Sequence, residues 1–204
     1  IVGDELLSLL QQATGDASNS ASLSAFDASL ILQLISGDID NIPIDNSDSF
    51  TANGDLQSPE ILGEVGEIVT IPISIENSNN LLSFTISFMY NNVQLESGSV
   101  YLGTISDYGF LVESSVSDSG SIIVTGASPT SIGGDLDLFT MYFIPTEFEN
   151  GQLEIECNQI MLNEVMQQQS FSILINNQLQ IGNEVKPNRI NLENNFPNPF
   201  NNNT

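Results

Sequence analysis

The sequence predicts a mainly β protein, folded as an antiparallel sandwich or barrel, with a small helical segment at its N-terminal end. Apolar and polar residues alternate with a period of two within residues 61–180, and turn-forming Asn, Asp and Gly residues separate the alternating runs. Helical spacing of apolar residues is confined to residues 4–36. The chain has 204 residues, which suits one main domain with small appendages.

Two helices are expected near the start of the chain. Leucines cluster at helical spacing within Asp4–Gln12, and apolar residues recur at positions i, i+3, i+4 and i+7 within Ala28–Ile35. Gly37 is the expected C-cap of the second helix. We therefore assign residues 1–43 to a helical segment, and residues 44–60, which are rich in Asn, Asp, Ser, Gly and Pro, to a linker.

Strands are predicted wherever the alternation holds in the main domain, residues 61–180. The predicted strands are Val69–Ile75, Ser83–Tyr90, Val100–Ile105, Ser121–Gly126, Leu138–Ile144, Leu153–Cys157 and Ser170–Ile175. The turn signals between them are Asn79-Asn80, Asp118-Ser119-Gly120, Gly133-Gly134 and Asn150-Gly151. Pro72 indicates an edge strand or a bulge, because proline has no N–H to donate to a neighbouring strand.

Charge and composition exclude several classes of function. The chain has 26 acidic residues, no His, and only two basic residues, Lys186 and Arg189, so its formal charge is −24. The absence of His excludes Ser-His-Asp and Cys-His catalysis, and with a single Cys it also excludes a structural zinc site. We expect neither nucleic-acid binding nor membrane insertion. Cys157 is expected in the core, with an intermolecular disulfide as the alternative.

Residues 16–27 have the spacing of a twelve-residue calcium loop, which places oxygen ligands at positions 1, 3, 5, 7, 9 and 12. The residues at these positions are Asp16, Ser18, Ser20, Ser22 (through its carbonyl), Ser24 and Asp27. Only two are carboxylates, and Ala21 stands where such loops usually have Gly, so we expect calcium to bind weakly. The alternative is a metal-free, serine-rich turn in which Asp27 caps the following helix.

The stretch from Gly15 to Gln33 resembles one repeat of a dockerin, a calcium loop followed by a helix. Dockerins usually have two repeats, and here the other is reduced to the Asp4–Gln12 helix without a loop. The resemblance implies that a protein partner is contacted by Ala25, Phe26, Ser29, Leu30 and Gln33. An exposed Phe26 would anchor such an interface, whereas the alternative places Phe26 against the leucine-rich first helix.

Two stretches of the main domain resemble a cohesin: Gly66–Glu96 resembles its opening, and Gly133–Phe143 resembles a strand near its end. The resemblance implies a nine-stranded jelly-roll sandwich that has no catalytic role and binds dockerins on one sheet face. By alternation, the outward residues of two predicted strands are Thr85, Ser87, Thr140 and Tyr142. Tyr142 suits an interface, because tyrosine is amphipathic and loses little entropy on binding; the alternative is a solvated polar face.

The tail, residues 181–204, is polar and has little capacity to fold alone. Its Asn-Phe-Pro-Asn-Pro-Phe-Asn run, within Asn191–Asn201, is similar to the start of the C-terminal sorting domain of the type IX secretion system. That similarity implies export to the outside or the surface of a Gram-negative cell. The alternative is an ordinary proline-containing tail.

These resemblances together predict a non-catalytic, extracellular assembly protein. Residues 1–43 of one copy would dock on the sandwich of the next, and repetition of this contact would produce head-to-tail polymers or filaments. Calcium is the expected cofactor. The alternatives are a module that tethers a larger secreted protein to a surface scaffold, and a carbohydrate-binding module. A glycosidase needs two carboxyl groups about 5–9.5 Å apart, and nothing in the sequence selects such a pair.

Overall fold

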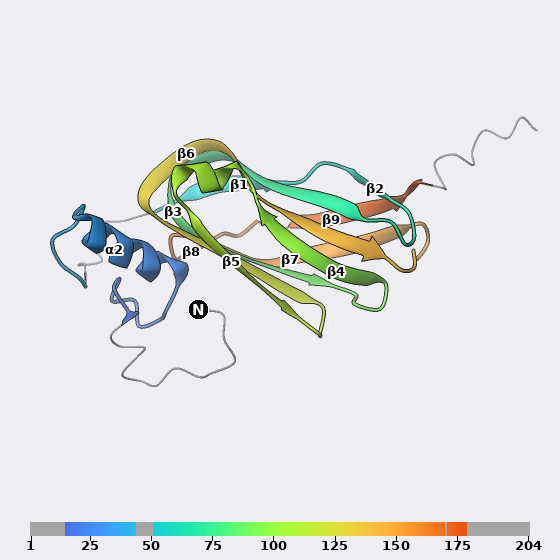
Figure 1. Ribbon diagram of the computed structural model, residues 1–204, viewed down its shortest axis with the longest axis horizontal. Coiled ribbons are helices and arrows are strands. Elements are labelled where there is room, and N and C mark those ends of the chain that lie inside the picture. The colour runs from blue at the N-terminus through green and yellow to red at the C-terminus, as the bar shows by residue number, and fades with distance from the viewer. Residues whose placement is uncertain (1–14, 44–50, 170, 179–204) are drawn as a thin grey trace, which may run out of the picture.

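The computed structural model describes residues 15–43, 51–169 and 171–178 (Figure 1). The described part is a mainly antiparallel β-sandwich with the helix α2 (Ala25–Ser36) at one end, so the predicted mainly β fold is confirmed. The predicted Asp4–Gln12 helix and the tail 181–204 lie outside the described residues. No helix in the described ranges is long and apolar enough to cross a bilayer.

Two long strands, β3 (Val69–Tyr90) and β6 (Ser121–Pro145), run through both layers of the sandwich. The first half of β3 pairs with the second half of β6, and the second half of β3 pairs with the first half of β6. The other strands are β1 (Asn53–Gln57), β2 (Ile61–Gly63), β4 (Leu95–Leu102), β5 (Leu111–Ser117), β7 (Gln152–Leu162), β8 (Val165–Met166) and β9 (Phe171–Asn177). In one layer, which we call the β4 layer, β6 pairs with β4 and β3 with β1; in the other, the β5 layer, β6 pairs with β5 and β3 with β7.

Bulges mark the corner where β3 and β6 pass from one layer to the other. Register shifts occur between Ile75 and Ser83 of β3, and Asn77, Asn80 and Gly134 have left-handed φ values of 51°, 53° and 100°. The predicted turns at Asn79-Asn80 and Gly133-Gly134 are therefore wrong as chain reversals. Left-handed residues and bulges change the direction of a strand pair while the pairing continues.

The other two turn signals do reverse the chain. Residues 118–120 connect β5 to β6, and Asn150-Gly151 precedes β7. Asn150 and Gly151 have φ values of 51° and 82°, as a tight hairpin turn requires. Pro72 lies where β3 pairs with β6 but not with β1, which is the edge position expected for proline.

Several assignments differ from the sequence-based prediction, among them β2 and β8, which were not predicted. Strand β1 lies within the predicted linker 44–60. It was not predicted, because its five residues have a single buried side chain, Leu56, and show no visible alternation. Strand β5 was not predicted, since its outward positions and most of its inward ones are polar or exposed. Strand β4 begins and ends earlier than Val100–Ile105, because Thr104–Tyr108 forms the 3-10 helix η1.

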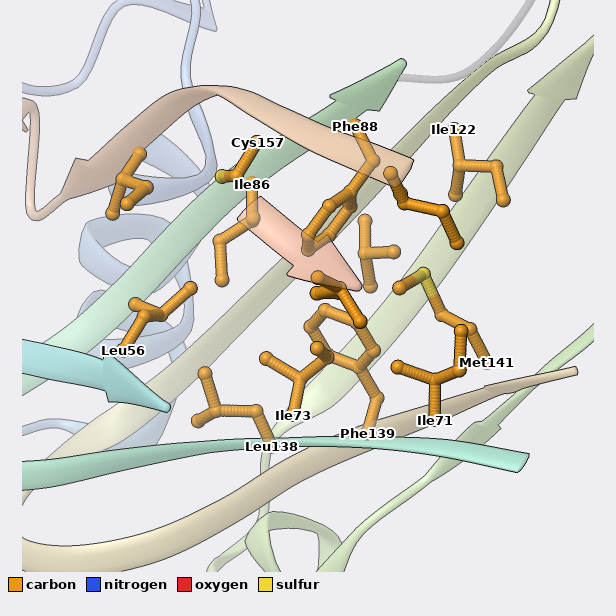
Figure 2. Close-up of a cluster of buried hydrophobic side chains, with 14 of the residues drawn as sticks. Leu56, Ile71, Ile73, Ile86, Phe88, Ile122, Leu138, Phe139, Met141 and Cys157 are labelled. Atoms are coloured by element: carbon orange, nitrogen blue, oxygen red, sulfur yellow. The ribbon is translucent and has the colours of Figure 1, made fainter. Parts of the chain in front are cut away.

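Alternate residues of both layers form one apolar core (Figure 2). Phe139 of the β4 layer packs against Phe84 and Phe88 of the β5 layer, with ring centroids 6.2 Å apart in both pairs. Cys157 belongs to this core and is 8% exposed, so its predicted core position is confirmed. Burial raises the pKa of its thiol to about 11, which leaves it a poor nucleophile near neutral pH.

Asn163, in the turn between β7 and β8, supports the corner of β3. Its side-chain oxygen accepts hydrogen bonds from the backbone N–H groups of Leu82 and Ser83, both at 2.9 Å. Its amide nitrogen donates to the Asn80 carbonyl at 2.7 Å. Asn163 is only 3% exposed, so these bonds satisfy buried backbone groups beside the register shift.

We predict that Asn163→Ala lowers the free energy of unfolding by about 3 kcal/mol, because two buried N–H groups lose their acceptor. Urea unfolding measures the loss. The matched control is Asn150→Ala, at an exposed turn position with a similar φ of 51°. The free energy of unfolding of that control should fall by about 1 kcal/mol, because alanine tolerates the left-handed backbone less well than asparagine and no other interaction is lost. Equal losses in the two variants would contradict the role given to the Asn163 side chain.

Candidate functional site

Helix α2 begins at a capping box. Ser24 is the N-cap, and its side chain accepts a hydrogen bond from the Phe26 N–H at 3.1 Å. The Asp27 carboxylate accepts the Ser24 N–H at 2.8 Å and the Ser18 N–H at 2.9 Å. The helix ends at Gly37, which has a φ of 83°, as predicted. Asp27 therefore caps the helix and also ties the helix to the preceding loop.

Asp16 organises the first half of the loop. Its carboxylate accepts hydrogen bonds from the backbone N–H groups of Ser20 at 2.9 Å and Ala21 at 2.8 Å. Ala21 has a φ of 67°, so the loop makes its left-handed turn without the glycine that such loops usually have. The Ser22 carbonyl accepts a hydrogen bond from the Ser20 hydroxyl at 3.2 Å.

Glu164 is a site residue that the sequence reasoning missed. It lies in the turn between β7 and β8, and its Oε1 accepts hydrogen bonds from the hydroxyls of Ser18, Ser20 and Ser24. The donor–acceptor distances are 3.0, 3.1 and 2.7 Å. Three of the predicted metal-ligand positions thus converge on one carboxylate oxygen from the sandwich. No local signal could reveal this, because even the nearest of the three serines is 140 positions away.

Serine hydroxyls link three carboxylates, two in the loop and that of Glu164 in the sandwich. Ser18 Oγ lies 3.4 Å from an Asp16 oxygen, Ser24 Oγ lies 3.3 Å from an Asp27 oxygen, and both also contact Glu164. The described ranges contain no Lys, Arg or His that could balance these charges. Within the same ranges, no three carboxylate or thiol groups are close enough to hold a metal ion by themselves. Serine oxygens would have to complete any calcium site.

The helical segment, residues 15–43, packs on the sandwich of its own chain. Ala17, Phe26 and Leu30 form an apolar cluster with Leu82 of β3. The Ser29 hydroxyl donates a hydrogen bond to the Leu82 carbonyl at 2.8 Å. Figure 1 shows α2 at the end of the sandwich near β3, β5 and β8.

This packing changes the role of the residues that the dockerin resemblance assigned to a partner. Phe26 is 3% exposed, so the expectation of an exposed anchor is wrong. Ser29, Leu30 and Gln33 are also buried, and Ala25 is half-buried. Packing of Phe26 on the Asp4–Gln12 helix involves residues outside the described ranges. In this structure α2 packs on β3 and β6 of its own chain.

The four residues predicted to face outward on the sandwich do not form one surface, and the prediction is wrong for Ser87, which is buried at 7% exposure. Thr85 and Ser87 lie in the β5 layer, where they pair with Thr125 and Ile123 of β6. The other two, Thr140 and Tyr142, lie in the second half of β6, in the β4 layer. Beside them the sequence reasoning missed Tyr101, whose ring packs edge-on against Tyr142 at 5.0 Å. The structure therefore separates the two predicted pairs onto different layers.

The fold is that of solved cohesin modules. The cohesin module from a family 33 glycoside hydrolase of Clostridium perfringens has a TM-score of 0.52, with 16% identity over 62% of this chain and 98% of that one. A cohesin from Clostridium thermocellum, solved as a type I cohesin–dockerin complex, has a TM-score of 0.50 and 15% identity, and covers 61% of this chain and 99% of its own. The sixth cohesin of scaffoldin B from Acetivibrio cellulolyticus, solved in complex with a dockerin, has a TM-score of 0.50 and 15% identity over 62% of this chain and 99% of that one.

These likenesses bear out the cohesin-like sandwich that the sequence predicts. No protein-family model matches the sequence, and a search of curated proteins finds no match. The matched structures extend over about three fifths of this chain, and the dockerin-like segment and the sorting-domain tail remain predictions.

We predict that Glu164→Gln loosens the helical segment without unfolding the sandwich. An amide oxygen accepts weaker hydrogen bonds than a carboxylate, so the loop should open more often. Hydrogen exchange of backbone amides in residues 15–36 should become roughly tenfold faster, while amides in β3 and β6 keep their protection.

The matched control is Glu154→Gln, an exposed position on β7 that removes the same charge. Exchange in residues 15–36 should be unaffected by it. If both variants leave the segment equally protected, the Glu164 carboxylate does not hold the loop.

Proposed function

We propose that this chain is a non-catalytic, extracellular protein-docking module that assembles with copies of itself. The helical segment is the ligand, the sandwich is the receptor, and copies join when the segment of one docks on the sandwich of the next. The observation that carries the proposal is the seating of residues 15–43 on the sandwich through the Ser29–Leu82 and Glu164–serine hydrogen bonds. Ligand and receptor surfaces are therefore present in the same chain.

The solved structures support the receptor part of the proposal. Two of the similar cohesins were solved in complexes with dockerins, so a sandwich of this fold receives a separate protein ligand in those cases. The chemistry of the described residues points the same way, because they include no His and their thiol is buried with a raised pKa. Docking is the function that the fold and these contacts support best.

Exchange between copies would use the same contacts that the single chain makes with itself. If each copy gives its segment to the next, the contact is heterologous and extends into a filament unless the rotation closes a ring. The intramolecular contact competes with this exchange at an effective concentration of the order of millimolar. The formal charge of −24 opposes assembly further, so high protein concentration and salt should favour it.

We predict that the purified chain forms oligomers whose size increases with protein concentration and ionic strength, measured by light scattering and negative-stain imaging. Leu30→Asp should leave a copy able to receive a helical segment but unable to donate one, because Leu30 is fully buried on the side of α2 that packs on the sandwich. Added to the wild type, it should shorten the polymers.

Ile35→Asp is the control for that variant, because Ile35 lies on the same helix and is 76% exposed. It should assemble like the wild type once the added charge is screened by salt. A chain that stays monomeric at every concentration and salt would contradict self-assembly and favour a module that binds a foreign protein.

We also propose that the loop binds calcium, with Asp16 and Asp27 as the charged ligands and serine oxygens as neutral ones. The support is chemical: three carboxylates are linked by shared hydroxyls, and the described ranges contain no basic side chain. Calcium prefers such hard oxygen ligands, and sites with few charges have dissociation constants near 10⁻⁴–10⁻³ M, roughly the range for extracellular modules.

Calcium should therefore raise the free energy of unfolding by about 1.4 kcal/mol at roughly 10 mM, for a dissociation constant of about 1 mM. Thermal unfolding with and without calcium measures the effect, with magnesium at equal ionic strength as the reference. Asp16→Asn should abolish the difference between the two metals, whereas Asp55→Asn, in β1, should preserve it. Equal responses of the wild type to calcium and magnesium would contradict a specific site.

The tail supports one further part of the proposal, export by a type IX secretion system to the outside or the surface of the cell. This part rests on the sequence of Asn191–Asn201 alone, which lies outside the described residues. It places the docking module where calcium is present at millimolar concentration, within the range expected for the loop.

A further inference from the structure

An apolar groove of about 480 Å³ lies between the helical segment and the β5 layer. Its apolar lining includes Leu23, Ala28, Ile31 and Leu32 from the segment and Leu111 and Ala127 from the sheet. Leu111 is 65% exposed, although it lies directly beside the helix. Gly15, the first described residue of the segment, also lines the groove.

Helix α2 has two apolar sides, of which the sandwich covers only one. Phe26 and Leu30 are buried in the cluster with Leu82, whereas Ala28 and Leu32 line the groove. A helix that is apolar all round is normally covered on both sides. The side of α2 that faces the groove therefore lacks a partner among the described residues.

We infer that the leucine-rich segment Asp4–Gln12 of the same chain fills this groove. Asp4–Gln12 ends three residues before Gly15, which is part of the groove lining. Leu10 is five residues from Gly15, so their Cα atoms are about 8 Å apart in a helix and at most about 18 Å apart in an extended chain. The leucines cannot move far from the groove, and this proximity favours them over a second copy.

The side chains of Asp4–Gln12 match the lining of the groove in polarity and charge. Leu6, Leu7, Leu9 and Leu10 supply apolar surface at helical spacing. The acidic residues Asp4 and Glu5 lie at the end of the segment farthest from Gly15, whereas Gln11 and Gln12, nearest to it, are neutral. Asp27 and Glu113 also line the groove, so the neutral Gln11 and Gln12 add no negative charge beside these carboxylates. The inference does not depend on assembly between copies.

Fluorescence of a single tryptophan tests the inference, because the natural chain has no Trp. In Leu10→Trp, at a concentration where the protein is monomeric, the emission should be blue-shifted and acrylamide should quench it poorly. Adding Leu111→Asn, which removes apolar lining from an exposed position, should shift the emission to the red and increase quenching several-fold. Leu7→Trp serves as a second reporter in case the indole fits poorly at position 10.

Leu174→Asn is the matched control, since Leu174 is also an exposed strand leucine, 46% exposed, but lies on β9 outside the groove. It should leave the emission unchanged. A solvent-exposed tryptophan at both positions, or an emission insensitive to Leu111→Asn, would overturn the inference. A blue shift that appears only as protein concentration rises would also overturn it, by assigning the groove to a second copy. A protected tryptophan in a chain that never assembles would count against the proposed function alone.

Discussion

One turn, Asn163-Glu164, contacts both the corner of the sandwich and the helical segment. Asn163 satisfies backbone groups at the corner of β3, and Glu164 gathers three hydroxyls of the loop. Both residues have left-handed φ values, 46° and 66°, and that conformation is unfavourable for Glu. The surrounding hydrogen bonds offset this backbone energy, so the turn couples the bend of the sandwich to the position of the segment.

The near absence of basic residues dictates the chemistry of these contacts. An acidic chain cannot balance a partly buried carboxylate with Lys or Arg, so neutral donors must do so. Asp16 and Asp27 accept backbone N–H groups, and Glu164 accepts serine hydroxyls. The same serines that make the loop a poor match to a calcium loop are thus the residues that bind it to the sandwich. Their hydroxyl oxygens are also potential ligands for a cation.

The sequence predicted those parts of the structure that local patterns determine. Strands with one face in the core alternate visibly, and the caps at Asp27 and Gly37 follow from the sequence, whereas the N-cap Ser24 was not predicted. Strands β1 and β5 were not predicted, because they have too few buried side chains to show an alternation of apolar and polar residues. Pairing between distant segments leaves no local pattern either, which is why neither Glu164 nor the separation of Thr85 from Tyr142 was foreseen.

If the chain carries both a ligand and its receptor, as proposed, it stays closed unless the concentration of other copies competes with its own segment. Opening must break the apolar cluster around Leu30 and the hydrogen bonds to Glu164 together, since α2 and the loop are tied through Asp27. If the leucines of residues 4–12 occupy the groove, they are released in the same event, because Gly15 joins them to the loop. In the proposed assembly the helical segment would therefore exchange as one unit, and assembly would depend on the energy of this whole interface in the closed chain.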